Sequence, residues 1–435
     1  MKPERTILLV ILAVSRCSVA AERGGEPWWP QFRGPNSSGL GAGKPPVQFG
    51  PGQNLGWKTA VGSGTSSPII WAERVFVTEF DPASRKLATL SIDRRTGNLL
   101  WRRAVVAEQV EEVHELSSPA AATPATDGER VYVYFGSYGL LCYDLDGKLE
   151  WERRLPLPEN PYGATASPIL VGDLLIFNHQ GKDAYLLALN RRDGRTVWRT
   201  DRSKFQFGWS TPVHWRHDAS DEVLVLGGDF EPNQRLMAYD LATGAERWWV
   251  AGLPPCGKST PAIGGGLVFL AAPDIILNQS AEKRNPDKAA QFYAKNGNRL
   301  MAVRPGSTGE VPQANIAWSD RKGVPGVASP LYYDGRLYTF KDGGLVFCRA
   351  AATGELLFNE RLGTLGYYYS SPVAADHRIY IASAEGVITV IDAGAKLNVL
   401  ATNKLDGAIL ATPALAADNI YVRTKSDLYA FGNRP

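Results

Sequence analysis

Short runs in which apolar and polar residues alternate, separated by glycine-containing turns, fill the chain from about residue 55 onward. The clearest example is 122–151, ATPATDGERVYVYFGSYGLLCYDLDGKLEW, with apolar runs at 131–134 and 140–143 and turn signals at Asp127-Gly128 and Asp146-Gly147. Alternation at every second position predicts β-strands and not helices. The stretch predicts four short strands joined by three turns. Such a unit cannot bury its own faces, so it needs copies of itself.

Copies of this unit recur along the chain. Each opens with a Ser-Pro or Thr-Pro pair, and the proline-to-proline intervals are 56, 44, 44, 49, 69, 42 and 41 residues. A base period in the low forties with four strands per repeat is typical of β-propellers. The sequence therefore predicts an all-β fold, an eight-bladed β-propeller of four-stranded antiparallel blades. The eight pairs are Ser67-Pro68, Thr123-Pro124, Ser167-Pro168, Thr211-Pro212, Thr260-Pro261, Ser329-Pro330, Ser371-Pro372 and Thr412-Pro413.

A large aromatic residue ends most repeats, on the strand expected to lie outermost in its blade. A side chain of this size can wedge between neighbouring blades as an apolar contact. We therefore expect these residues to be structural and to dock one blade onto the next. They are Trp57, Trp101, Trp151, Trp198, Trp248, Trp318 and Phe358.

The two ends of the repeat region complete each other. Residues 55–61 resemble an outermost strand with no inner strands before it, whereas 411–432 supplies inner strands and no outer one. We expect the N-terminal strand to close the ring, which removes an unpaired sheet edge. The predicted domains are a signal peptide at 1–21, an extended N-terminal arm at 22–54 that lies across the propeller, and the eight-bladed propeller at 55–432.

Residues 1–21 have the features of a secretory signal peptide. Lys2 and Arg5 supply positive charge, 7–14 are apolar but too few to span a bilayer, and 18–20 are small residues suited to cleavage. Cys17 follows Arg16, where a lipid-attachment site needs a small residue, so we expect cleavage without a lipid anchor. An uncleaved apolar anchor is the alternative. The protein is expected to be exported, periplasmic or extracellular, with no transmembrane segment.

Charge and cysteine content exclude several classes of partner and fold. The formal net charge of +3 falls to +1 without residues 1–21, which carry three basic residues and one acidic residue. The chain has no basic stripe, so we expect no nucleic-acid partner. Cys142 and Cys348 occupy the same place in two repeats and are expected to be buried fillers, while Cys256 lies in a loop. No disulfide framework is implied.

The turn between the third and fourth strands carries the most specific motif. Its clearest copy is 238–248, AYDLATGAERW, with related copies at 91–101, 188–198 and 348–358. The Asp caps the turn by accepting backbone N–H groups, and the Gly takes the position with positive φ. At this motif the chain resembles the pyrroloquinoline-quinone (PQQ) type of eight-bladed propeller, over roughly residues 55–432. The stretch 29–35, WPQFRGP, is also similar to the segment preceding many secreted propellers of this kind.

This resemblance implies two groups of relatives with different activities. The same blades occur in quinoprotein dehydrogenases and in the propeller lipoprotein of the outer-membrane barrel-assembly machinery. The dehydrogenases have a vicinal cysteine pair against the quinone. This chain has no adjacent cysteines, no Cys-x-x-Cys-His and no trio of calcium ligands placed by a motif. It is therefore closer to the non-catalytic secreted members and the assembly lipoprotein, and we expect no catalytic residue, no metal and no cofactor.

The long connections concentrate on one end of the predicted propeller, named here the loop face. It carries the loops between blades and those between second and third strands, including the acidic loop 105–118 and the insertion 273–298. Long loops carry function more often than short ones. The candidate ligand- or partner-binding residues on this face are His114, Glu115, Tyr162, His179, Phe207, Trp209, Lys258, Tyr367, Tyr368 and Tyr369.

Each of these candidates also has a purely structural interpretation. The acidic loop is typical of a solvated surface. His114 and His179 come from separate loops, which is a weak metal signal. The aromatic residues can pack around the axis, or they can form a pocket, since aromatic residues are enriched at binding surfaces. In a pocket, Lys258 at the rim would favour an anionic group.

Three classes of function remain open. We expect an exported non-catalytic scaffold that binds a protein or a small molecule on the loop face. The alternative is a quinoprotein-like oxidoreductase that uses PQQ and calcium. A hydrolytic or sugar-binding site built on the loop face is the third. The absent dehydrogenase motifs favour the first, because a propeller fold does not by itself imply an activity.

Overall fold

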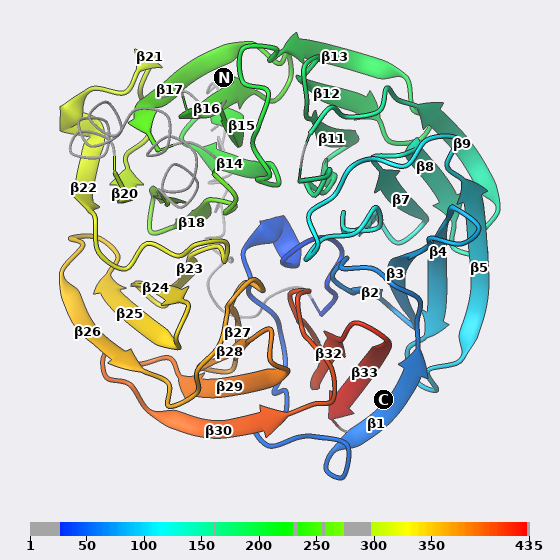
Figure 1. The fold of residues 1–435 in the computed structure, drawn as a ribbon. Helices are drawn as coiled ribbons and strands as arrows, with labels where there is room; N and C mark the ends of the chain where they lie inside the picture. Colours follow the sequence, from blue (N-terminus) through cyan, green and yellow to red (C-terminus); the bar gives the residue numbers. More distant parts are fainter. Residues whose placement is uncertain (1–26, 161, 229–233, 255–256, 274–296, 433–435) are drawn as a thin grey trace, which may run out of the picture.

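Eight β-sheets are arranged around a central axis (Figure 1) in the computed structural model, which describes residues 27–160, 162–228, 234–254, 257–273 and 297–432. Each sheet is a blade whose first strand lies nearest the axis. The predicted all-β, eight-bladed propeller of four-stranded antiparallel blades is confirmed, with one blade extended by a fifth strand. Two 3-10 turns, η1 (Pro35–Ser37) and η2 (Gln313–Asn315), complete the secondary structure of the described residues.

The first four blades follow the chain without crossovers. Blade 1 contains β2 (Ile69–Trp71), β3 (Arg74–Asp81), β4 (Lys86–Asp93) and β5 (Leu99–Val106). Blade 2 contains β6 (Ala125–Thr126), β7 (Arg130–Phe135), β8 (Gly139–Asp144) and β9 (Leu149–Arg154). Blade 3 contains β10 (Ile169–Val171), β11 (Leu174–His179), β12 (Tyr185–Asn190) and β13 (Thr196–Asp201). Blade 4 contains β14 (Val213–His217), β15 (Ser220–Gly227), β16 (Gln234–Asp240) and β17 (Glu246–Leu253).

The remaining blades continue the same pattern until the last one. Blade 5 contains β18 (Ala262–Gly264), β19 (Leu267–Ala272), β20 (Arg299–Val303) and β22 (Ile316–Asp320). Blade 6 contains β23 (Leu331–Tyr333), β24 (Arg336–Lys341), β25 (Leu345–Ala350) and β26 (Leu356–Arg361). Blade 7 contains β27 (Val373–Ala375), β28 (Arg378–Ala382), β29 (Val387–Asp392) and β30 (Val399–Lys404). Blade 8 contains β31 (Ala414–Ala416), β32 (Asn419–Arg423), β33 (Asp427–Gly432) and the N-terminal β1 (Leu55–Ala60).

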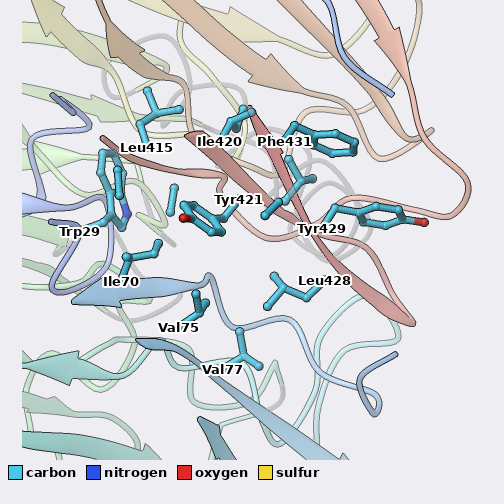
Figure 2. Close-up of a cluster of buried hydrophobic side chains, with 14 of the residues drawn as sticks. Trp29, Ile70, Val75, Val77, Leu415, Ile420, Tyr421, Leu428, Tyr429 and Phe431 are labelled. Carbon is cyan, nitrogen blue, oxygen red and sulfur yellow. The ribbon is translucent and has the colours of Figure 1, made fainter. Parts of the chain in front are cut away.

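Strand β1 closes the ring, as predicted. It pairs antiparallel with β33, and Lys58 lies opposite Tyr429 in the register. Figure 2 shows the apolar core at this closure, where Trp29, Ile70 and Val75 face Leu415 and Tyr421 across the junction of blades 1 and 8. The first and last parts of the chain therefore share one core, which couples closure to the burial of apolar surface.

The Ser/Thr-Pro pairs form a ring of hydrogen bonds around the axis. At seven of the junctions, the backbone N–H of the Ser or Thr donates to the hydroxyl of its counterpart in the next blade, over 2.9–3.1 Å. The hydroxyl is thus needed as an acceptor, and small size is only part of the reason for Ser or Thr here. We name this set the hydroxyl ring: Ser67, Thr123, Ser167, Thr211, Thr260, Ser329, Ser371 and Thr412.

Five of the aromatic residues at the blade ends donate their indole N–H to a backbone carbonyl of the next blade. Trp198 is an example, with Nε1 2.9 Å from the carbonyl oxygen of Leu241. Gly244 lies against the same ring with φ of 71°, and a Cβ there would come within 2.4 Å of the indole. The other four indole–carbonyl pairs are Trp57 with Arg94, Trp101 with Leu145, Trp151 with Arg191 and Trp318 with Ala351.

Trp248 and Phe358 depart from this pattern. Phe358 has no N–H to donate and is buried in the core of blade 6. Trp248 is buried and donates instead to the carboxylate of Glu222 in its own blade, at 2.9 Å. Its strand β17 pairs on the outside with a fifth strand, β21 (Gly309–Glu310), in parallel. At this junction, the connection between β20 and β22 of blade 5, which contains β21, lies beside the outer strand of blade 4 in place of a short glycine turn.

The segment 27–54 runs along the inner strands of most blades (Figure 1, blue, with η1 near the axis). Trp29 exchanges two backbone hydrogen bonds with Ile70 of blade 1, and Pro30 accepts from Thr126 of blade 2. Further along, Gly41 donates to Ala374 of blade 7. These contacts lie near the short first-to-second-strand turns, so the segment covers the end of the axis opposite the loop face.

Candidate functional site

Five of the residues predicted from the sequence lie together on the loop face. They come from the four inter-blade connections that follow β5, β9, β13 and β17. The ring of Tyr162 lies 5.8 Å from that of His114 and 5.3 Å, edge-on, from that of Trp209. Phe207 stacks on Trp209 at 6.1 Å, and Nζ of Lys258 lies 5.8 Å from the centre of the Tyr162 ring. We name His114, Tyr162, Phe207 and Trp209 the aromatic cluster.

Trp209 is the buried anchor of this cluster. Its indole N–H donates to the carbonyl oxygen of Gly163 at 3.1 Å, which ties the connection after β13 to the connection after β9. His114 is exposed, and Tyr162 and Phe207 are half-buried. The exposed side of the aromatic cluster is therefore formed by His114 and Tyr162, with Lys258 beside them.

A cavity of about 290 Å³ lies on the same face, over blades 7, 8 and 1. Its charged lining residues are Glu115, Arg423 and Lys425, and Leu116 and Leu410 contribute apolar surface. The loop 107–121 connects the two features, because His114 belongs to the aromatic cluster and residues 115–118 line the cavity. The cavity volume lies at the lower end of the range of small-molecule sites, roughly 300–1,000 Å³.

The three consecutive tyrosines do not act together as predicted. Tyr367 is 57% exposed and stacks at 6.1 Å on the half-buried Tyr369. Tyr368 points inward and is buried in the core between blades 6 and 7, with its hydroxyl 3.2 Å from Oγ1 of Thr364. Alternation along an extended segment sends the middle residue to the opposite side. Tyr368 therefore supports the loop and does not line the surface.

The loop that carries these tyrosines is held in place by its neighbours. The backbone N–H of Tyr367 donates to the Glu385 carboxylate at 3.2 Å, and that of Tyr368 donates to Asp342 at 2.8 Å. Burial raises the pKa of Tyr369, and the carboxylates of Asp342, Glu385 and Glu115 add to this rise. The surroundings of the exposed tyrosine pair are thus acidic.

His179 does not reach the loop-face surface. It lies at the end of β11, is buried, and stacks on Tyr185 with ring centroids 4.6 Å apart. Burial, with a smaller effect from Arg199, lowers the pKa of His179 to about 4. The imidazole is therefore neutral at physiological pH, and it is separated from the exposed His114.

Glu111 is a feature that the sequence did not reveal. In the acidic loop Glu108, Glu112 and Glu115 are exposed, but Glu111 is buried. Its carboxylate accepts the N–H of Ala164 at 2.7 Å, and burial raises the pKa of Glu111 to about 7. A Cβ at residue 136 would come within 2.3 Å of this carboxylate, so Gly136 leaves the room it needs. Gly136 was therefore the one sign in the sequence that a side chain is buried at this point.

The insertion 273–298 contributes little that can be described. Residues 274–296 lie outside the described part of the chain, so the proposed binding role of this insertion is not addressed by the structure. Its two ends continue from β19 and into β20. Cys256 also lies outside the described residues, whereas Cys142 and Cys348 are buried and free.

A second cavity, of about 380 Å³, lies at the opposite end, between the turns of blades 3 and 4. Four carboxylates line it, and each is held by a basic partner. Asp173 pairs with Arg191, Asp221 with Arg216, Glu222 with His217 and Asp240 with Arg247. The carboxylates are therefore engaged within the protein, which favours a structural role for this end.

Across residues 27–160, 162–228, 234–254, 257–273 and 297–432, no three His, Cys, Asp or Glu side chains lie together so that they could hold a metal ion. Phe207 stacks on Trp209, and Trp209 is only 7% exposed. Cys142 and Cys348 lie in blades 2 and 6 and cannot form a pair. Within the described residues, no helix is long and apolar enough to cross a membrane.

Comparison with solved structures finds the same fold in proteins of different activity. BamB from Moraxella catarrhalis aligns with a TM-score of 0.57 and 15% identity over 86% of this chain and 100% of that one. The quinohemoprotein alcohol dehydrogenase from Comamonas testosteroni aligns with a TM-score of 0.61 and 12% identity, over 93% of this chain and 80% of that one. A europium-containing methanol dehydrogenase aligns with a TM-score of 0.55 and 10% identity, over 94% of this chain and 98% of that one. At these identities the likeness shows the fold alone.

The sequence itself identifies the family. Among curated proteins none gives a significant match. The family model described as outer membrane protein assembly factor BamB matches residues 21–201 and 182–434, which together span nearly the whole chain. The chain therefore belongs to this family of PQQ-type eight-bladed propellers.

Proposed function

We propose that the protein is an exported, non-catalytic scaffold that binds a protein partner through its loop face. Membership of the BamB family supports this proposal, because the family is named for an assembly factor. The same family supports a periplasmic or outer-membrane-associated location. The carboxylates that line the second cavity are held by basic partners, and Glu111 and His179 are buried, so these groups serve the fold.

The observation that carries the proposal is a pair of exposed apolar side chains on a loop that hydrogen bonds hold in place. Leu365 is 76% exposed and Tyr367 is 57% exposed, between β26 and β27. Large apolar side chains exposed in this way mark interaction sites when they are contiguous. The loop is fixed by hydrogen bonds to Glu385 and Asp342, so little conformational entropy is lost when a partner binds. Leu116, which is exposed at the cavity, extends this surface.

Site-specific photo-crosslinking in cells tests the proposal. A photoreactive residue at position 367 should give one dominant crosslinked protein, and a residue at 356, exposed on β26, should not. The double variant Leu365→Ser with Tyr367→Ser should lose the crosslinked partner captured from position 116. The matched control, Leu356→Ser with Val399→Ser, should retain it. Equal crosslinking at 367 and 356, or capture that survives the loop variant, would rule out this face.

A further inference from the structure

The guanidinium of Arg33 is fully buried at the axis without an acidic partner. Its Nη2 donates to the carbonyl oxygen of Pro330 at 2.8 Å, and Nε and Nη1 have no hydrogen-bond partner. Among the described residues no carboxylate lies within ion-pair distance of Arg33. Arg349, also buried, has Asp320 at 2.7 Å. Burying a charge without compensation is costly, so the surroundings of Arg33 call for an opposite charge.

Arg33 keeps its positive charge in this position. Burial lowers the pKa of Arg33 to about 9, which is still above neutral pH. The segment around it is held in an unusual conformation, with φ of 58° at Arg33 and 70° at Gly34. Trp29 packs against Gly34, where a Cβ would come within 2.7 Å of the indole. The backbone is thus shaped to place Arg33 inside the ring of blades.

The hydroxyl ring supplies further donors beside Arg33. The acceptor of Arg33, Pro330, follows Ser329 directly, so the guanidinium contacts the chain beside one member of this ring. Each hydroxyl that accepts a backbone N–H still has its own O–H to donate. The ring residues are all buried, and the structure gives none of these hydroxyls an acceptor for its proton. Hydrogen-bond donors therefore gather around the Arg33 charge. Arg423 is also buried, but it donates to Ser66 and Gly62.

We propose that a single monovalent anion of the size of chloride binds on the axis, between Arg33 and the hydroxyl ring. One anion would neutralise the Arg33 guanidinium and accept from its Nε and Nη1 and from a neighbouring ring hydroxyl. A water molecule would accept hydrogen bonds from the donors but would leave the positive charge of Arg33 uncompensated. The segment 27–54 closes the end of the axis, which favours a small inorganic ion over an organic ligand. The bound anion would fasten this segment to the blades.

The decisive measurement is the anomalous scattering of bromide. The protein is unfolded, refolded in sodium bromide and crystallised from bromide, and an anomalous peak is expected in contact with the Arg33 guanidinium. In a parallel experiment, protein refolded without halide is titrated with chloride at constant ionic strength. Its Tm should rise and then saturate, because an ion that binds only the folded state stabilises it by mass action.

Two variants separate this site from general salt effects. Arg33→Met should abolish both the bromide peak and the chloride-dependent rise in Tm. Ser210→Ala removes a buried hydroxyl just outside the ring and should leave both unchanged. If Arg33→Met does not fold, the wild-type crystals still decide the question. Absence of a peak at Arg33, or a Tm that does not depend on chloride, would overturn the proposal.

Discussion

Glu111 and His179 illustrate how single buried residues set the pH dependence of this fold. The two are linked through Tyr134 and Phe177, whose rings lie 4.2 Å apart between blades 2 and 3. Burial raises the pKa of Glu111 to about 7 and lowers that of His179 to about 4. Both shifts disfavour the charged form. Glu111 therefore lowers the free energy of unfolding at high pH, and His179 lowers it at low pH.

The raised pKa of Glu111 predicts how stability changes with pH. Below pH 4.5 the residue is protonated in both states, and as the pH rises toward 7 the unfolded chain loses the proton first. Stability therefore falls with rising pH, and the loss is complete above about pH 7. Glu111→Gln should be more stable than the wild type at pH 8, by on the order of 1–3 kcal/mol. The difference should shrink toward pH 4.5.

Urea unfolding across this pH range measures the effect. Glu108→Gln, in the same loop but exposed, is the control and should change the free energy of unfolding little at any pH. A difference between Glu111→Gln and the wild type that stays constant from pH 4.5 to pH 8 would show that Glu111 ionises normally.

At the scale of the element, the contact between an outer tryptophan and the next glycine turn is the repeated unit. Gly244 has φ of 71° and touches the Trp198 ring, whereas Gly172 has φ of 56° and open space around its Cα. Gly172→Ala should cost about 1–2 kcal/mol, the strain of the left-handed conformation alone. Gly244→Ala should cost about 1–3 kcal/mol more, because the methyl group overpacks the blade junction.

The comparison is made by denaturant unfolding of the two alanine variants. Equal losses of stability would mean that the indole moves aside freely and that the turn contact does not hold the blades together. A larger loss for Gly244→Ala, together with a shift of tryptophan emission to longer wavelength, would locate the damage at Trp198.

Removal of the tryptophan itself provides a second prediction at this scale. Trp198→Ala should destabilise the protein by on the order of 3–5 kcal/mol, as expected for emptying a large buried site. Trp198→Phe should lose less, because it keeps a six-membered aromatic ring while it gives up the rest of the indole and the hydrogen bond to Leu241. The measurement is the midpoint of thermal or urea unfolding. A small effect of Trp198→Ala would contradict a docking role.

At the scale of the molecule, the sequence predicted what is local and missed what depends on distant segments. Each blade except the last is encoded in one continuous stretch, so its strands and turns could be read from the repeats. Ring closure joins distant segments, but it followed from the outer strand that the last repeat lacks. The burial of Glu111 depends on Ala164 in another blade, and that of Arg33 on Pro330, 297 positions away. Tyr368 was predicted on the surface but is buried, because the direction of a side chain in this loop cannot be inferred from the repeat pattern.

The quinoprotein alternative is tested on the whole protein. With added PQQ and calcium we expect no tight binding and no dye-linked oxidation of alcohols, because the sequence has no adjacent cysteines and no calcium ligands placed by a motif. Spectroscopic titration of PQQ measures binding independently of turnover. Saturable binding with calcium-dependent turnover would replace the scaffold proposal with an oxidoreductase.

Ring closure by β1 gives the last prediction. Replacing residues 55–60 with six Gly and Ser residues keeps the chain connected but removes Trp57 and the partner strand of β33. The unpaired edge should lower the Tm and promote aggregation, since closure is what protects a propeller from edge pairing. Hydrogen exchange should show lost protection at 427–431 first. The control replaces Gly309 and Glu310, a strand that adds to blade 4 without closing the ring, and should leave the Tm nearly unchanged. If both replacements behave alike, then the blades hold together through their faces, and the pairing of β1 with β33 contributes little to stability.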